Sequence, residues 1–134
     1  MIKTKKMKNQ PEFQLQKQVC NNLNLKYKDV LFLSDTIAFL QLTIPQRVRN
    51  STIQKRGFHC PDIIIFKPNS KFNGLFLELK AKSPFKKDGC LLKSEHLANQ
   101  QQTIDQLNEM NYFATFAVGF EETKTFIDWY MTLK

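Results

Sequence analysis

The stretch DIIIFKPNSKFNGLFLELKAK, residues 62–82, decides the fold because it predicts two strands joined by a turn. Residues 63–66 are apolar on both faces, as expected of a strand in the middle of a covered sheet. Turn-forming residues follow at 68–70 and 73–74. Residues 75–82 follow, and the second half of this segment alternates strictly between polar and apolar side chains. We therefore expect these two strands to form a hairpin.

This hairpin would bring three charged side chains together. Side chains alternate along a strand, so Glu78 and Lys80 share one face. With the turn centred near residues 69–71, antiparallel pairing brings Asp62 level with residues 78–80, within direct or diagonal reach. Two such carboxylates suit Mg²⁺, which can polarise a phosphodiester and lower the pKa of a bound water. Lys80 would orient that water and stabilise charge on phosphorus.

The same three residues also have a purely structural interpretation. Asp62 could cap a turn after Pro61, with Glu78 and Lys80 on the solvent face of an edge strand. However, Asp62 begins the most apolar strand of the chain, where an uncompensated carboxylate would be costly. Its position therefore favours a functional role.

Apolar spacing predicts the other elements. Helices are expected over residues 10–25, 94–110 and 121–133, and strands over 29–34 and 112–118. Pro45 could begin a short basic helix that runs through Gln54. Asn111 could close the helix over residues 94–110, and Gly119 should break the last strand. The main order is helix, three strands, helix, strand and helix. It indicates an α/β fold with a central mixed sheet flanked by helices.

Composition indicates one ordered domain with a polyanionic partner. The length of 134 residues suits a single domain, and the apolar fraction of 42% argues against a disordered chain. Lys and Arg number 20 against 12 Asp and Glu, giving a net charge of +8 that favours nucleic acid. We expect a basic flexible tail over residues 1–9 and a single domain over 10–134.

The three cysteines do not predict a disulfide framework. They are odd in number and widely spaced, and no signal peptide precedes them, so a reducing intracellular compartment is expected. No window approaches the length of a membrane span, so no membrane partner is expected. A zinc site from His59, Cys60, Cys90 and His96 is disfavoured because no CxxC or HxxxH spacing is present.

The sequence also resembles a known nuclease family. Pro61-Asp62 and, sixteen positions after the aspartate, Glu78-Leu79-Lys80 resemble the PD-(D/E)xK signature. The element order resembles its restriction-endonuclease-like core, αβββαβ plus a C-terminal helix. The segments RGFHCPDIIIF, GLFLELKAK, HLANQQQTIDQL and FAVGFEETKTFIDWY are similar to the small stand-alone VRR-NUC nucleases of phages and prophages. The likeness to the VRR-NUC nucleases runs from residue 56 through residue 130. The resemblance as a whole covers most of the chain and is weaker before residue 35.

The resemblance implies specific roles for the hairpin residues. Asp62 and Glu78 would bind Mg²⁺ or Mn²⁺ together with the backbone carbonyl of Leu79, and Lys80 would be the catalytic lysine. The substrate would be DNA, either branched or flap-like, in the cytoplasm of a prokaryotic cell or a phage host. A homodimer is a further implication.

Two more site residues come from the resemblance alone. It makes Gln100 the helix glutamine near the site and Glu12 the acid of the first helix. From the residues themselves, Gln100 is one of three consecutive glutamines and could be an ordinary surface residue. Glu12 could lie in the first turn of its helix only because the helix dipole stabilises an acidic side chain there. Asp35 is interpreted as a turn residue and stays outside the catalytic set.

Basic residues around the hairpin could follow a phosphate backbone. A solvated basic surface is the competing interpretation of these side chains, which are Arg47, Arg49, Lys55, Arg56 and Lys82. The sequence therefore predicts a metal-dependent endonuclease acting on DNA. The alternatives are a non-catalytic nucleic-acid-binding module on the same fold and, less favoured, an RNA-directed nuclease.

Overall fold

The computed structural model describes residues 10–35 and 40–134, and within them the chain forms a four-stranded sheet in the order β1-β2-β3-β4. The strands are β1 (Phe32–Ser34), β2 (Ile63–Ile65), β3 (Leu75–Lys80) and β4 (Phe113–Val118). β1, β2 and β3 pair antiparallel, and β3 pairs parallel with β4. The predicted mixed sheet is confirmed, whereas the predicted tail over residues 1–9 lies outside the described residues.

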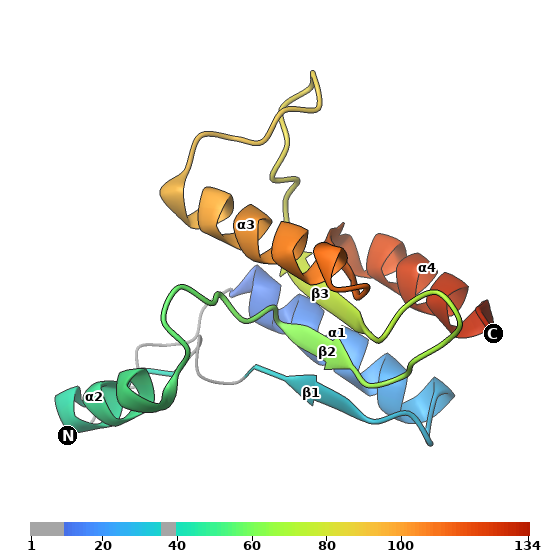
Figure 1. Ribbon diagram of the computed structural model, residues 1–134, viewed down its shortest axis with the longest axis horizontal. Coiled ribbons are helices and arrows are strands. Elements are labelled where there is room, and N and C mark those ends of the chain that lie inside the picture. Colours follow the sequence, from blue (N-terminus) through green and yellow to red (C-terminus); the bar gives the residue numbers. More distant parts are fainter. Residues whose placement is uncertain (1–9, 36–39) are drawn as a thin grey trace.

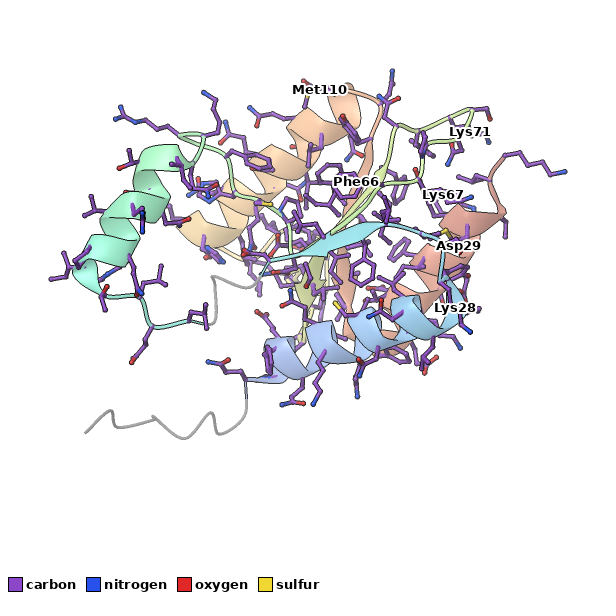
Figure 2. All side chains as sticks on the ribbon, turned by 90° about the horizontal axis from the view of Figure 1, so that it is seen from below. Lys28, Asp29, Phe66, Lys67, Lys71 and Met110 are labelled. Carbon is purple, nitrogen blue, oxygen red and sulfur yellow. The ribbon has the colours of Figure 1, made fainter. Side chains whose placement is uncertain are left out.

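Helices cover both faces of this sheet. They are α1 (Pro11–Lys26), α2 (Ile44–Ile53), α3 (Glu95–Glu109) and α4 (Gly119–Thr132). α1 and α4 lie on one face and α3 lies on the other (Figure 1). Figure 2 looks onto the β1 edge and shows α1 and α3 on opposite sides of the sheet. α2 stands apart from the sheet and buries none of its side chains.

Alternation along the strands divides the apolar residues between two cores. The larger core lies between the sheet and helices α1 and α4, and it includes Ile63, Leu77, Leu79, Val19 and Ile127. The smaller core lies under α3 and includes Ile104, Leu107, Ala114 and Phe116. Because Leu77 and Leu79 face the larger core, Glu78 and Lys80 must face the α3 side.

The hairpin register agrees with the sequence prediction. Ile63 pairs with Leu77 and Ile65 with Leu75, which centres the turn within residues 69–71. The side chain of Asn69 holds this turn by accepting hydrogen bonds from the backbone N–H groups of Lys71 at 2.9 Å and Phe72 at 2.8 Å. The next pair along the ladder brings Asp62 opposite Glu78.

All four strands are shorter than predicted, and β1 and β3 lose more than one residue because their partners end. β3 stops at Lys80 instead of residue 82, since Lys80 already pairs with Val118, the last residue of β4. β1 covers only Phe32–Ser34 instead of residues 29–34, since β2 offers three residues for pairing. The missing part of β1 is a turn in which Val30 N–H binds the carbonyl of Tyr27 at 3.1 Å.

Helix ends also refine the prediction. α4 begins at Gly119, where φ is +74°, so the glycine turns the chain from β4 directly into the helix instead of two residues later. Asn111 has φ +63° and follows the last turn of α3, which confirms its predicted place at the end of that helix. The short basic helix predicted from Pro45 is α2, and Thr43 caps it with Gln46 in a capping box.

Candidate active site

Asp62 and Glu78 meet across the hairpin on the side of the sheet that faces α3. Oδ2 of Asp62 accepts a hydrogen bond of 2.7 Å from the backbone N–H of Leu79, which fixes the carboxyl against β3. The side chain of Glu78 is 6% exposed, and the two carboxyl groups lie within hydrogen-bonding reach of each other. The predicted convergence of these two acids is present in the fold.

Burial makes both carboxyls hard to ionise. It raises the pKa of Glu78 to about 9, reinforced by the negative charge of Asp62 and the hydrogen bond between the two groups. Burial also raises the pKa of Asp62, although hydrogen bonds from Leu79 and Glu78 oppose that rise. A hydrogen bond between two carboxyls requires a proton on one of them. A nearby positive charge would therefore favour ionisation of both carboxyls.

Lys80 lies on the same face as Glu78 and is also buried, at 7% exposed. Its Nζ lies 5.9 Å from the centroid of the Phe116 ring, where a cation is attracted by the π-electrons. Its positive charge lowers the pKa of both Asp62 and Glu78. Among the described residues no ion pair joins this ammonium to either carboxyl, so it stays available to a third group.

Gln100 reaches the site from α3. Its Nε2 donates a hydrogen bond of 2.7 Å to Oε1 of Glu78, and its side chain is 7% exposed. The same nitrogen lies 3.1 Å from Nε2 of His96, one helical turn earlier. Oε1 of Gln100 is buried and has no hydrogen-bond partner among the described residues. The resemblance placed this glutamine near the site, and the fold agrees.

A cavity of about 410 Å³ opens over these groups. Its lining is mostly polar and consists of Glu12, Asp35, His59, Cys60, Asp62, Glu78, His96 and Gln100. Glu12 is exposed in the first turn of α1, and its charge raises the pKa of both Asp62 and Glu78. Asp35, interpreted from the sequence as a turn residue outside the site, lines the same cavity. Four carboxyl groups therefore face one hollow.

Gln16 supports the site from α1 and was missed by the sequence analysis. It is 5% exposed, and its Nε2 lies 2.5 Å from Oγ of Ser34, 2.8 Å from the carbonyl of Asp35 and 3.4 Å from the carbonyl of Asp62. The backbone N–H of Asp35 donates to the same Asp62 carbonyl at 2.9 Å. Gln16 thus ties the helix that carries Glu12 to the backbone of Asp62.

The predicted nucleic-acid contacts lie outside the cavity. Arg47 and Arg49 are on α2, Lys55 and Arg56 are in the segment between α2 and β2, and Lys82 follows β3. All five side chains are exposed, and none lines the cavity. The fold brings the acids and Lys80 together, but it leaves these cations spread over the surface around them.

The donor set fits a hard divalent cation better than zinc. Within residues 10–35 and 40–134, no three His, Cys, Asp or Glu side chains converge closely enough to hold a metal by themselves. Two carboxyls supplemented by a backbone carbonyl and water are a normal set for Mg²⁺. Zinc prefers thiolate and imidazole ligands, and burial together with the nearby acids raises the pKa of the Cys60 thiol, which disfavours a thiolate there. Cys90 does not line the cavity.

The comparisons with known proteins bear on the fold. No protein-family model matches the sequence, and no curated protein matches it. A solved structure described as "VRR_NUC domain protein" matches with a TM-score of 0.64 and 20% sequence identity. The match covers 95% of this chain and 93% of that one. The α/β fold predicted from the sequence is therefore confirmed, and the chain has the fold of a VRR_NUC domain protein.

Proposed function

We propose that this chain is a metal-dependent endonuclease that hydrolyses phosphodiester bonds in DNA. The observation that carries the proposal is the buried pair of Asp62 and Glu78, which lines the cavity and shares one face of the hairpin with the buried Lys80. Burying two carboxyls side by side is costly, and a bound cation would offset that cost. The fold of a VRR_NUC domain protein supports the same function.

Asp62 and Glu78 would hold Mg²⁺ or Mn²⁺, with the carbonyl of Leu79 as a third ligand. The chemistry supplied by such an ion is polarisation of the scissile phosphate and a lower pKa for water bound to it. The Leu79 N–H fixes Oδ2 of Asp62, and Gln100 fixes Oε1 of Glu78. Each carboxyl is thus oriented by one fixed donor, as metal-binding carboxylates usually are.

Lys80 would act on the phosphate and the attacking water. Its ammonium is buried beside Phe116 and is not neutralised by an ion pair within the described part of the chain. A fixed charge in such a place can stabilise the negative charge that develops on the phosphate oxygens. Glu12 lies across the cavity, where it could accept a proton from the attacking water.

The direct test is cleavage of plasmid and branched DNA by the purified protein. We expect nicking with Mg²⁺ or Mn²⁺ and none with a chelator. The isosteric changes Asp62→Asn and Glu78→Gln should each lower the rate by at least about a hundredfold. Glu109→Gln, an exposed acid at the far end of α3, is the matched control and should cut like the wild type. If all three variants cut DNA equally well, Asp62 and Glu78 could not be the catalytic acids.

The rival proposal is a non-catalytic module that binds nucleic acid. It would use the same exposed cations, whose phosphate contacts make binding depend steeply on salt. The rival predicts salt-sensitive DNA binding with no cleavage for any metal or DNA structure. An RNA-directed nuclease is separated by offering matched RNA and DNA substrates of the same branched shape.

A homodimer is also proposed, because part of the sheet is left uncovered on the α3 side. Leu31 and Leu33 beside β2 are 75% and 56% exposed, and Phe66 at its end is 56% exposed (Figure 2). Exposed apolar groups of this kind mark association surfaces. Light scattering on the eluted protein should give twice the chain mass, and a purely monomeric peak would contradict the dimer.

We place the protein in the cytoplasm of a prokaryotic cell or a phage host. All three cysteines are free, which suits a reducing compartment. None of the helices in the described ranges combines the length and apolarity that crossing a membrane requires. Fractionation of cells that express the protein would test this location.

A further inference from the structure

The contact between His96 and Gln100 has no role in the reaction proposed above. His96 lies in the first turn of α3, and its Nε2 is 3.1 Å from Nε2 of Gln100. That amide nitrogen is also 2.7 Å from Oε1 of Glu78. One nitrogen of Gln100 therefore faces an imidazole on one side and a carboxyl on the other.

The chemistry of an amide limits how these neighbours can be protonated. An amide nitrogen carries two hydrogens and cannot accept, so both neighbours must accept from it. Glu78 then presents a bare oxygen, and His96 presents a bare Nε2 with its hydrogen on Nδ1. If the amide were flipped, its oxygen would face both groups, and each would have to donate. The protonation of His96 at Nε2 and of Glu78 at Oε1 is thus linked through the single amide of Gln100.

We propose that His96 is a positioning residue, which accepts a hydrogen bond at Nε2 and thereby keeps the nitrogen of Gln100 directed at Glu78. In that orientation Oε1 of Glu78 is held as an acceptor, which is the form that binds a cation. The consequence for the cation rests on the proposed function, whereas the contact between imidazole and amide does not. His96 thus supports a metal ligand through one intermediate side chain.

The chain provides an internal control for this role. His59 is the other histidine, and it lines the same cavity. Its backbone N–H donates to Oγ1 of Thr103 at 3.3 Å, and within the described residues its ring makes no hydrogen bond with Gln100. A change at Gln100 should therefore alter the ring of His96 and leave that of His59 as it was.

The first test uses the metal-free protein and long-range ¹H–¹⁵N spectra of the histidine rings. When its ring is neutral, His96 should carry its hydrogen on Nδ1. In Gln100→Ala the hydrogen should move to Nε2, while His59 shows the same tautomer in both proteins. An unchanged His96 tautomer in Gln100→Ala would overturn the proposal.

The second test measures Mn²⁺ affinity by calorimetry without DNA. His96→Ala should bind Mn²⁺ about three- to tenfold more weakly, the range expected for losing one hydrogen bond behind a ligand. His96→Gln, whose side-chain oxygen can take the place of Nε2, should restore most of that affinity. Thermal unfolding of both variants checks that they fold. Wild-type affinity in His96→Ala, or no recovery in His96→Gln, would overturn the role.

The two tests separate the failure of this inference from the failure of the proposed function. If the wild type bound no Mn²⁺, the nuclease proposal would fail, and with it the consequence for the cation. The spectra of the metal-free protein would still decide whether His96 accepts from Gln100.

Discussion

The raised pKa of Glu78 predicts that metal affinity depends strongly on pH. The carboxyl has a pKa of about 9 because it is buried beside Asp62. At pH 7, about two units lower, only about one molecule in a hundred has an ionised Glu78, so a metal ion must displace a proton. The apparent affinity at pH 7 should therefore be about a hundredfold below its high-pH limit, and it should rise about tenfold per pH unit.

Calorimetric titration with Mn²⁺ measures both parts of this prediction. Repeating it in buffers with different ionisation heats should show about one proton released per ion near pH 7. Glu78→Gln should bind more weakly and lose most of the pH dependence, because the titrating group is gone. A wild-type affinity that does not change with pH, with no proton released, would refute the account of Glu78.

Three further perturbations follow from the same contacts. Metal-free wild type should lose stability as pH rises from about 4.5 to about 9, because the folded state then binds one proton more than the unfolded state. Urea unfolding should show a fall of roughly a few kcal/mol, and Glu78→Gln should remove most of that fall. Gln16→Met, which keeps the volume but removes the bonds to Ser34 and Asp62, should cost about 1–3 kcal/mol in urea unfolding and slow cleavage; unchanged stability and rate would contradict its role. Replacing Arg47 and Arg49 by Gln should lower the slope of log affinity against log salt by about 2 in anisotropy titrations with duplex DNA, and an unchanged slope would exclude them from the interface.

The hairpin was accessible from the sequence because short-range rules determine it. Alternation after Gly74 assigned Glu78 and Lys80 to one face, and the turn formers fixed the register that brings Asp62 opposite Glu78. What those rules could not give is where a strand loses its partner. β3 ends at Lys80 because β4 ends at Val118, and no local pattern at residues 81–82 records that.

The residues that support the site are harder to predict from the sequence, because their partners are distant along the chain. Gln16 looks like any helix glutamine, and its role depends on where α1 crosses the ends of β1 and β2. Gln100 was selected by resemblance, since nothing local separates it from its two neighbouring glutamines. Asp35 follows a short strand, and only the assembled sheet turns it toward the cavity. One feature of the sequence does point to Gln16. It lies one turn after Glu12, among the apolar residues of its helix, where a polar side chain needs a partner.

The central claim is that Asp62 and Glu78 hold a divalent cation beside Lys80. Anomalous diffraction from crystals soaked in Mn²⁺ tests it most directly, because the signal locates the ion without assumptions about its ligands. The account predicts a single strong peak between the carboxyls of Asp62 and Glu78, next to the carbonyl of Leu79, and its loss in Glu78→Gln. A Mn²⁺ peak elsewhere in the chain, with none at this pair, would contradict it.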